Sequence, residues 1–230
     1  MESRKTKRKA SAKIRILLVD DHVLMRRGLK TLIETEPDLV VCAEAATRLT
    51  GLDAITASNP DLVIIDLSLR NGDCDGLELI KDIKKHFPHL HMLVLTMHEE
   101  ATYAERALRA GARGYVTKQE LDGTVITAIR HVLAGEIHTS EAMSRRLTQK
   151  FVTGGKVGTG SEMDVLSDRE LEVFKRIGTG QTTRKIADEL FLSVKTIESY
   201  REHLKVKLGL ASGVELIRQA TLWVETGHMG

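Results

Sequence analysis

The chain has 230 residues, 42% of them hydrophobic, which favours two globular domains. No apolar run approaches the roughly 20 residues that cross a bilayer, and no apolar segment follows the charged amino terminus, which argues against a transmembrane protein and a secretory signal peptide. The two cysteines, Cys42 and Cys74, lack the spacing of a metal site, so we expect reduced thiols and a cytoplasmic location.

The formal net charge of +2 is unevenly distributed. Residues 1–13 carry six Lys or Arg and one Glu, residues 14–135 carry 14 basic and 18 acidic residues, and residues 164–230 balance ten against ten. We interpret 1–13 as a basic disordered tail, because so many cations with few apolar residues cannot form a core. The tail could contact nucleic acid or act only as a solubilising arm.

Short apolar runs alternate with amphipathic stretches from residue 14 to residue 135. The amphipathic stretches repeat apolar residues at helical spacing, as Leu79, Ile80 and Ile83 do. Near-continuous apolar strands alternating with such helices indicate a parallel sheet covered on both faces, so we predict a five-stranded α/β domain. The predicted strands are 14–19, 39–43, 62–65, 92–95 and 114–116.

Polar side chains follow four of these strands. Asp20 and Asp21 come after the first, Asp66 after the third, Thr96 after the fourth and Lys118 after the fifth. Because the carboxyl ends of parallel strands meet at one edge of a sheet, where α/β proteins bind ligands, we expect these side chains to form a site.

Three clustered carboxylates repel one another unless a proton or a cation offsets their charge. We favour Mg²⁺, which takes oxygen ligands and bridges carboxylates to phosphate, and we assign Asp20, Asp21 and Asp66 as its ligands. With the metal and Lys118 neutralising a phosphoryl group, Asp66 can itself accept that group as an aspartyl phosphate. Thr96 would donate its hydroxyl to the phosphoryl oxygens.

Residues 14–135 resemble the receiver domain of response regulators. The resemblance rests on the acidic pair, Asp66, the Asp75-Gly76 pair that opens the third helix, Thr96, and the run from Gly111 to Lys118. It implies a flavodoxin-like, doubly wound sheet with strand order 2-1-3-4-5 and a sensor histidine kinase as partner.

The same resemblance implies a conformational switch carried by Thr96 and Tyr115. In receiver domains the hydroxyl moves toward the phosphoryl group and the aromatic ring turns inward behind it; without the resemblance, Tyr115 would be read as a half-buried ring on an edge strand. Two features depart from the family pattern: Gln119 follows Lys118 where many receivers have proline, and the loop at 70–74 is long. The long loop bears on the metal geometry and on the lifetime of the phosphoryl group.

Residues 136–163 read as a linker, with a short helix at 142–151 followed by a Gly-rich stretch at 154–161. Residues 164–230 read as a small all-α domain of four helices. Ser167 and Glu170 have the spacing of a capping box, and a tight turn at 191–193 separates the second helix from the third. Two helices joined by such a turn indicate a helix-turn-helix, whose second helix enters the major groove of DNA.

This segment resembles the LuxR-type helix-turn-helix of the NarL/FixJ subfamily of response regulators. The matching residues run from Leu166 to Val173, through Lys185-Ile186-Ala187, to 193–198 and 207–209. The resemblance implies double-stranded DNA and RNA polymerase as partners and a homodimer when active or on DNA. Together the two resemblances cover nearly the whole chain outside the tail and linker.

The outward residues of the predicted recognition helix are our candidate DNA contacts. Basic members can neutralise phosphates, and Ser, Thr or Glu can address base edges. The simpler alternative is a solvated helix face, and the zero net charge of the segment gives it weight. Glu198 departs from many relatives, which have lysine there. The candidates are Lys195, Thr196, Glu198, Ser199, Arg201, Glu202 and Lys205.

The last helix, about 213–226, carries two apolar stripes. One contains Val214, Ile217, Thr221 and Val224, and the other contains Leu216, Ala220 and Trp223. One stripe can close the small core, and the other would be exposed on a monomer. Since related proteins dimerise through this helix, we assign Leu216, Ala220 and Trp223 to a dimer interface, although Trp223 would also fit the core.

We therefore expect a response regulator in which phosphorylation of Asp66 controls DNA binding and transcription. One alternative is a receiver that controls a protein-interaction module with a degenerate helix-turn-helix. Another is a Mg²⁺-dependent phosphohydrolase, which we disfavour because the chain lacks a cap domain and a second catalytic acid; we expect no enzyme.

Overall fold

The computed structural model describes residues 13–69, 74–98, 100–119, 121–152 and 162–226. Residues 1–12 of the predicted tail, 70–73 of the long loop and the predicted Gly-rich stretch lie outside these ranges. Within the ranges no helix has both the length and the apolar character needed to cross a membrane.

A five-stranded parallel sheet forms the centre of the first domain, with strand order β2-β1-β3-β4-β5. This confirms the predicted architecture. The predicted first and third strands match at both ends, and the other three are longer by one or two residues at one or both ends. The strands are β1 (Ile14–Val19), β2 (Leu39–Ala45), β3 (Leu62–Ile65), β4 (His91–Thr96) and β5 (Gly114–Thr117).

Alternate residues of the strands enter two cores on opposite faces of the sheet. Leu17 and Val19 of β1 pack with residues of α2, α3 and α4, whereas Ile16 and Leu18 pack with residues of α1 and α5. Both faces are therefore covered, as expected for a parallel sheet. The helices are α1 (Val23–Glu34), α2 (Arg48–Ser58), α3 (Cys74–His86), α4 (Glu100–Ala110) and α5 (Leu121–Leu133).

The expected linker helix is present as α6 (Glu141–Val152). A 3₁₀ turn, η1 (Glu162–Val165), then precedes a helical domain, and the predicted capping box of Ser167 and Glu170 forms at its first helix. The four helices are α7 (Asp168–Gly178), α8 (Thr183–Glu189), α9 (Val194–Leu208) and α10 (Gly213–Glu225).

Ion pairs tie the helices of this small domain together. The buried carboxylate of Glu172 accepts hydrogen bonds from Arg169 at 2.7 Å and from Arg176 at 3.2 Å, and Arg176 also pairs with Glu189 of α8. The Glu170 carboxylate accepts a bond from Lys207 of α9 at 2.7 Å. Because a buried charge is costly without partners, these pairs keep α7 in one position relative to its neighbours.

The assignment of the two stripes on α10 requires a correction. Leu216 and Ala220 are fully buried, and the Trp223 ring packs edge-on against Phe174 at 5.7 Å between centroids. They close the core of the domain against α7 and are not an exposed dimer face. The physical reason is the close packing of α7 on α10, which places this stripe inward.

The amino-terminal part of the other stripe stays outside, whereas Val224 near its other end is half-buried and lies next to Gly178 of α7. Val214 is 77% exposed and Ile217 is 45% exposed. An apolar pair at helical spacing on the surface is the kind of patch that a second protein surface covers.

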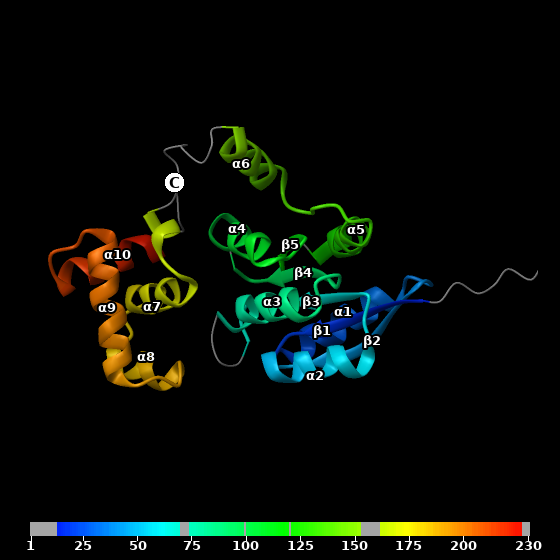
Figure 1. Cartoon of the computed structure of the whole chain (residues 1–230), viewed down its shortest axis with the longest axis horizontal. Helices are drawn as coiled ribbons and strands as arrows, with labels where there is room; N and C mark the ends of the chain where they lie inside the picture. The colour runs from blue at the N-terminus through cyan, green and yellow to red at the C-terminus, as the bar shows by residue number, and fades with distance from the viewer. Residues whose placement is uncertain (1–12, 70–73, 99, 120, 153–161, 227–230) are drawn as a thin grey trace, which may run out of the picture.

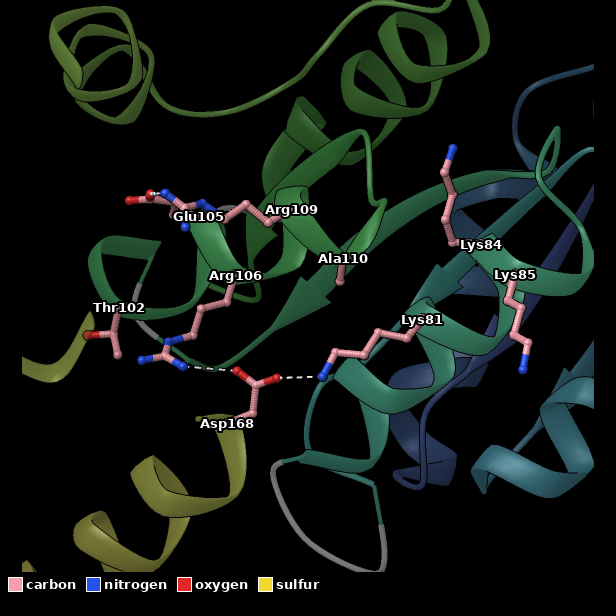
Figure 2. Close-up of a pocket in the computed structure, with 9 residues that line it drawn as sticks. All are labelled: Lys81, Lys84, Lys85, Thr102, Glu105, Arg106, Arg109, Ala110 and Asp168. Atoms are coloured by element: carbon pink, nitrogen blue, oxygen red, sulfur yellow. Dashed lines mark hydrogen bonds and ion pairs between the residues drawn. The ribbon is translucent and has the colours of Figure 1, made fainter. Parts of the chain in front are cut away.

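The helical domain lies beside the α3 and α4 side of the α/β domain and contacts it through α7 and the residues just before it (Figure 1). Asp168, the first residue of α7, accepts hydrogen bonds from Lys81 of α3 at 2.8 Å and Arg106 of α4 at 3.0 Å. These three charges form one part of the contact between the two domains (Figure 2).

Candidate acceptor site and DNA-binding face

Two neighbouring strands deliver the acidic residues. Because β1 and β3 are paired in parallel, Asp20 and Asp66 emerge side by side at the carboxyl edge of the sheet, and both are buried. Backbone N–H groups hold their outer oxygens: His22 N donates to Asp20 Oδ1 at 2.7 Å, and Ser68 N donates to Asp66 Oδ1 at 3.2 Å. The inner oxygens are thereby left facing the centre of the site.

Lys118 bridges those inner oxygens. Its Nζ lies 2.6 Å from Asp20 Oδ2 and 2.6 Å from Asp66 Oδ2. Burial by itself lowers the pKa of Lys118, but the hydrogen bonds and charges of the two carboxylates outweigh burial and raise the pKa above its ordinary value. Lys118 is therefore a fixed positive charge within reach of any group bound to Asp66.

The same cluster suits a divalent cation. Ligand atoms of Asp20, Asp21, His22 and Asp66 all lie within 4.8 Å of one another. The buried Asp21 Oδ1 has no hydrogen bond of acceptable geometry among the described residues, although His22 Nδ1 lies 2.8 Å away. A buried carboxylate oxygen without a proper donor, beside two more carboxylates, fits a hard cation.

Gly76 allows α3 to approach the acceptor loop. A Cβ at this position would overlap the Asp66 carbonyl and the Leu67 Cα and would lie 2.8 Å from the Leu67 oxygen. The Gly76 N–H donates to that same oxygen at 3.2 Å. A residue with a side chain would therefore push the loop after Asp66 out of place.

The two predicted switch residues lie on adjacent strands behind the acceptor. Thr96 is fully buried at the end of β4, and its carbonyl accepts the N–H of Lys118 at 2.7 Å. Tyr115 is also buried, and its hydroxyl donates to the carbonyl of His98 at 3.0 Å. The ring thus lies inward, against the loop that follows Thr96.

The candidate DNA contacts lie on α9. Lys195, Glu198, Ser199 and Glu202 are exposed, whereas Thr196, Arg201 and Lys205 are half-buried. Some of their polar groups have partners within the helix, since Lys205 pairs with Glu202 at 2.8 Å and the Thr196 hydroxyl contacts the capping Ser193 hydroxyl at 2.8 Å. The α/β domain contacts the helical domain at α7, and this contact leaves the outer face of α9 open to solvent.

Comparison with known proteins agrees with both resemblances. The profile of the response regulator receiver domain matches residues 16–130, and that of the bacterial regulatory proteins of the luxR family matches residues 164–220. The oxygen regulatory protein NreC of Staphylococcus aureus strain JH9 is 34% identical over 210 residues, which cover 90% of this chain and 96% of NreC. The chain belongs to the two-component response regulators.

Solved response regulators have the same architecture. RcsB from Salmonella enterica serovar Typhimurium, solved on promoter rprA with the phosphomimetic BeF3-, is 27% identical with a TM-score of 0.63, and the match covers 91% of this chain and 98% of RcsB. A LuxR-family two-component regulator from Aurantimonas is 34% identical with a TM-score of 0.56, over 61% of this chain and 99% of that one. The α/β domain is therefore the receiver domain, and the helical domain is a LuxR-type DNA-binding domain.

Sequence reasoning missed a chain of contacts between the receiver domain and α7. The buried His98 ring contacts the Ser68 hydroxyl at 2.7 Å through Nε2, and Lys175 Nζ of α7 lies 3.3 Å from His98 Nδ1. The His98 ring also packs on Tyr103 at 4.5 Å between centroids. Since Lys175 lies 77 residues from His98 in the chain, no local pattern signals this contact.

Proposed function

We propose that a sensor histidine kinase phosphorylates Asp66 and that this modification controls sequence-specific DNA binding and transcription by this response regulator. The observation that carries the proposal is the Lys118 ammonium group, 2.6 Å from both Asp20 and Asp66, with Asp21 beside them. One carboxylate can accept a phosphoryl group while the cation and the remaining acids stay in place around it.

In the transfer, an Asp66 oxygen forms a bond to phosphorus as the bond from phosphorus to the donor imidazole nitrogen breaks. The released imidazole takes up a proton from solvent. Lys118, which is charged at neutral pH, donates to a phosphoryl oxygen in place of the Asp66 oxygen it loses. Mg²⁺ held by Asp20, Asp21 and Asp66 would offset the negative charge of the phosphoryl oxygens.

The route to the DNA-binding domain runs through the loop after β4. The Thr96 hydroxyl oxygen accepts the N–H of His98 at 3.4 Å, and the His98 ring links Ser68, two residues after Asp66, to Lys175 of α7. A movement of Thr96 toward the phosphoryl group changes the position of His98, and with it the contact to Lys175. Tyr115 follows because its hydroxyl bonds to the His98 carbonyl.

The output is binding of α9 in the major groove. We expect exposed Lys195, Ser199, Glu198 and Glu202 to face the groove, with Lys195 on phosphates and the others on base edges. Half-buried Thr196, Arg201 and Lys205 are expected to add contacts beside them. The relative RcsB has been solved in complex with DNA and as two dimers on two parallel DNAs. We assign RNA polymerase as the further partner at the promoter.

We expect two copies to pair on DNA through the exposed face of α10, where Val214 and Ile217 lie. The Ile217→Asp variant should keep its fold and bind a DNA with two half-sites roughly tenfold more weakly, because it loses the linked second contact. Gel-shift titration together with mass photometry of the complexes measures both affinity and stoichiometry.

The neighbouring Leu216→Asp variant is the matched control for this assignment. Leu216 is fully buried, so a carboxylate there should destabilise the domain by about 3 kcal/mol or more and abolish binding to single half-sites too. If Ile217→Asp left the affinity and stoichiometry on paired half-sites unchanged, the dimer face would lie elsewhere.

The phosphorylation itself is tested with acetyl phosphate and Mg²⁺. Wild type should gain the mass of one phosphoryl group and bind selected duplex DNA more tightly, whereas Asp66→Asn should show neither change because the acceptor oxygen is replaced by an amide. Intact-mass spectrometry and DNA binding are measured on the same sample.

Asp53→Asn is the control, since Asp53 is an exposed carboxylate on α2 in the same domain. It should behave as wild type. Phosphoryl uptake by Asp66→Asn at the wild-type level would contradict the acceptor assignment. The absence of a steep dependence of DNA affinity on salt would contradict DNA binding and support a protein-interaction module.

A further inference from the structure

His22 directly follows the acidic pair, and its ring belongs to the same group of candidate ligands as Asp20, Asp21 and Asp66. The backbone N–H of His22 donates to Asp20 Oδ1 at 2.7 Å, which fixes residue 22 beside the acceptor site. Although His22 caps the amino terminus of α1, its side chain makes no capping hydrogen bond. The ring is therefore not needed to begin the helix, and its position among the carboxylates has to be explained in another way.

The ring nitrogen lies at distances from two carboxylates that suit ligands of one cation. His22 Nδ1 is 2.8 Å from Asp21 Oδ1 and 3.3 Å from Asp20 Oδ1. Two ligands at right angles on a cation with bonds of about 2.1 Å lie about 3.0 Å apart, and two opposite ligands lie about 4.2 Å apart. Ligand atoms of all four residues, Asp66 included, lie within 4.8 Å of one another, so small adjustments place them around one ion.

The contact between His22 and Asp21 is not an ordinary hydrogen bond. In the part of the chain that the structure describes, the buried Asp21 Oδ1 has no hydrogen bond of acceptable geometry, in spite of its 2.8 Å distance from Nδ1. The direction of Nδ1 instead meets Asp20 Oδ1 at 3.3 Å, so this nitrogen is aimed into the acidic cluster and not toward solvent. A nitrogen and a carboxylate oxygen in this arrangement match two ligands of a shared cation.

The charges of the cluster separate the role of His22 from that of the acids. Asp20, Asp21 and Asp66 carry three negative charges, and Lys118, 2.6 Å from two of these carboxylates, carries one positive charge. A divalent cation balances the remainder without any contribution from His22. A neutral imidazole adds a nitrogen ligand and no charge, and nitrogen suits Co²⁺, Ni²⁺ or Zn²⁺, whereas Mg²⁺ prefers oxygen. His22 is thus expected to determine which cation binds, and not whether one binds.

We propose that His22 is a nitrogen ligand of the metal site, and that the receiver domain therefore binds a divalent transition metal in preference to Mg²⁺. This inference rests on the function proposed above and adds the class of cation that the acceptor site takes. The ring is 66% exposed, which leaves it accessible to an ion that enters from solvent. Phosphoryl uptake then begins at a lower concentration of the transition metal than of Mg²⁺, so the supply of that metal becomes a second condition for the response.

The test compares wild type with His22→Gln, which keeps a polar side chain and removes the ligating nitrogen. Binding of Co²⁺ and of Mg²⁺ to the unphosphorylated full chain is measured by isothermal titration calorimetry. Wild type should bind Co²⁺ more tightly than Mg²⁺, and His22→Gln should lose about tenfold or more in Co²⁺ affinity while its Mg²⁺ affinity changes by less than about twofold. Electron spin echo spectroscopy of the Mn²⁺-loaded chain should show a coordinated imidazole nitrogen in wild type and none in His22→Gln.

His203→Gln is the matched control, because His203 is an exposed histidine on α9 of the other domain. It should leave both affinities and the nitrogen signal unchanged, whereas Asp21→Asn should weaken the binding of both metals and so place them in the acidic cluster. Equal Co²⁺ affinities of wild type and His22→Gln, or the absence of a nitrogen signal in wild type, would overturn the proposal.

Phosphoryl uptake with Mg²⁺, measured by intact mass, separates this proposal from the acceptor assignment. His22→Gln should still gain one phosphoryl group at saturating Mg²⁺, because the three carboxylates and Lys118 remain, and Asp66→Asn should gain none. Normal uptake by His22→Gln together with an unchanged Co²⁺ affinity would remove His22 from the ligands and leave Asp66 as the acceptor.

Discussion

The Lys118→Met variant is expected to accept no phosphoryl group from acetyl phosphate and to unfold more readily than wild type when divalent cations are absent. Asp20 and Asp66 are both buried and share Lys118 as their cation. Removing the cation leaves two carboxylates facing each other in a region of low dielectric, which costs about 3 kcal/mol of unfolding free energy. Urea unfolding followed by circular dichroism in EDTA measures this loss.

Added Mg²⁺ should raise the stability of Lys118→Met by more than it raises that of wild type, because the metal then supplies the only positive charge in the cluster. Lys30→Met on α1 is the control, since Lys30 is half-exposed and lies 3.9 Å from Glu44. It should change the unfolding free energy by less than about 0.5 kcal/mol. Equal stability of the two variants in EDTA would show that the Lys118 bridge is not structurally important.

A second large effect is expected in the DNA-binding domain from Gly178→Ala. Gly178 is buried where α7 meets α10, and a Cβ there would overlap the Ala220 carbonyl and lie 2.7 Å from Val224 Cγ2. The two helices would have to separate, so we expect a loss of about 3 kcal/mol and of DNA binding. Trp223, the single tryptophan, lies on α10 and reports this transition by fluorescence.

Gly28→Ala on α1 is the matched substitution, because a Cβ at Gly28 would meet no atom within 4 Å. It should stabilise the receiver domain by about 0.5–1 kcal/mol through the better helix propensity of alanine. If both substitutions had the same effect, the close approach of α7 and α10 would be disproved.

Local patterns were enough to predict the parallel α/β sheet and the polar groups at its strand ends, and the resemblance to receiver domains supplied the strand order. The strand ends at Val19 and Ile65 follow from continuous apolar runs, and the residues after them, Asp20 and Asp66, then meet because β1 and β3 are neighbours. The second strand runs on to Ala45 because Ala45 pairs with Val19, a contact that is not visible in the run itself.

Features that depend on tertiary packing could not be predicted in this way. The two stripes of α10 are offset by one residue, and only the close contact with α7 at Gly178 decides that Leu216 faces inward and Ile217 outward. The Asp168 contacts join residues 87 and 62 positions apart, so periodicity carries no sign of them. His22 belongs to the group of candidate metal ligands with Asp20, Asp21 and Asp66. In the sequence, its position directly after the acidic pair was the signal that could have indicated this.

The open outer face of α9 affects how promoter occupancy depends on the concentration of the protein. With α7 held against the receiver domain, the exposed side chains of α9 that would meet DNA remain accessible, so we expect an unphosphorylated chain to bind a single half-site. If two chains pair on DNA as proposed above, we expect control to act on that pairing as well as on the contact between α7 and the receiver domain. Promoter occupancy should rise with about the square of the concentration of active protein, and abundance of the protein alone should produce a low basal output.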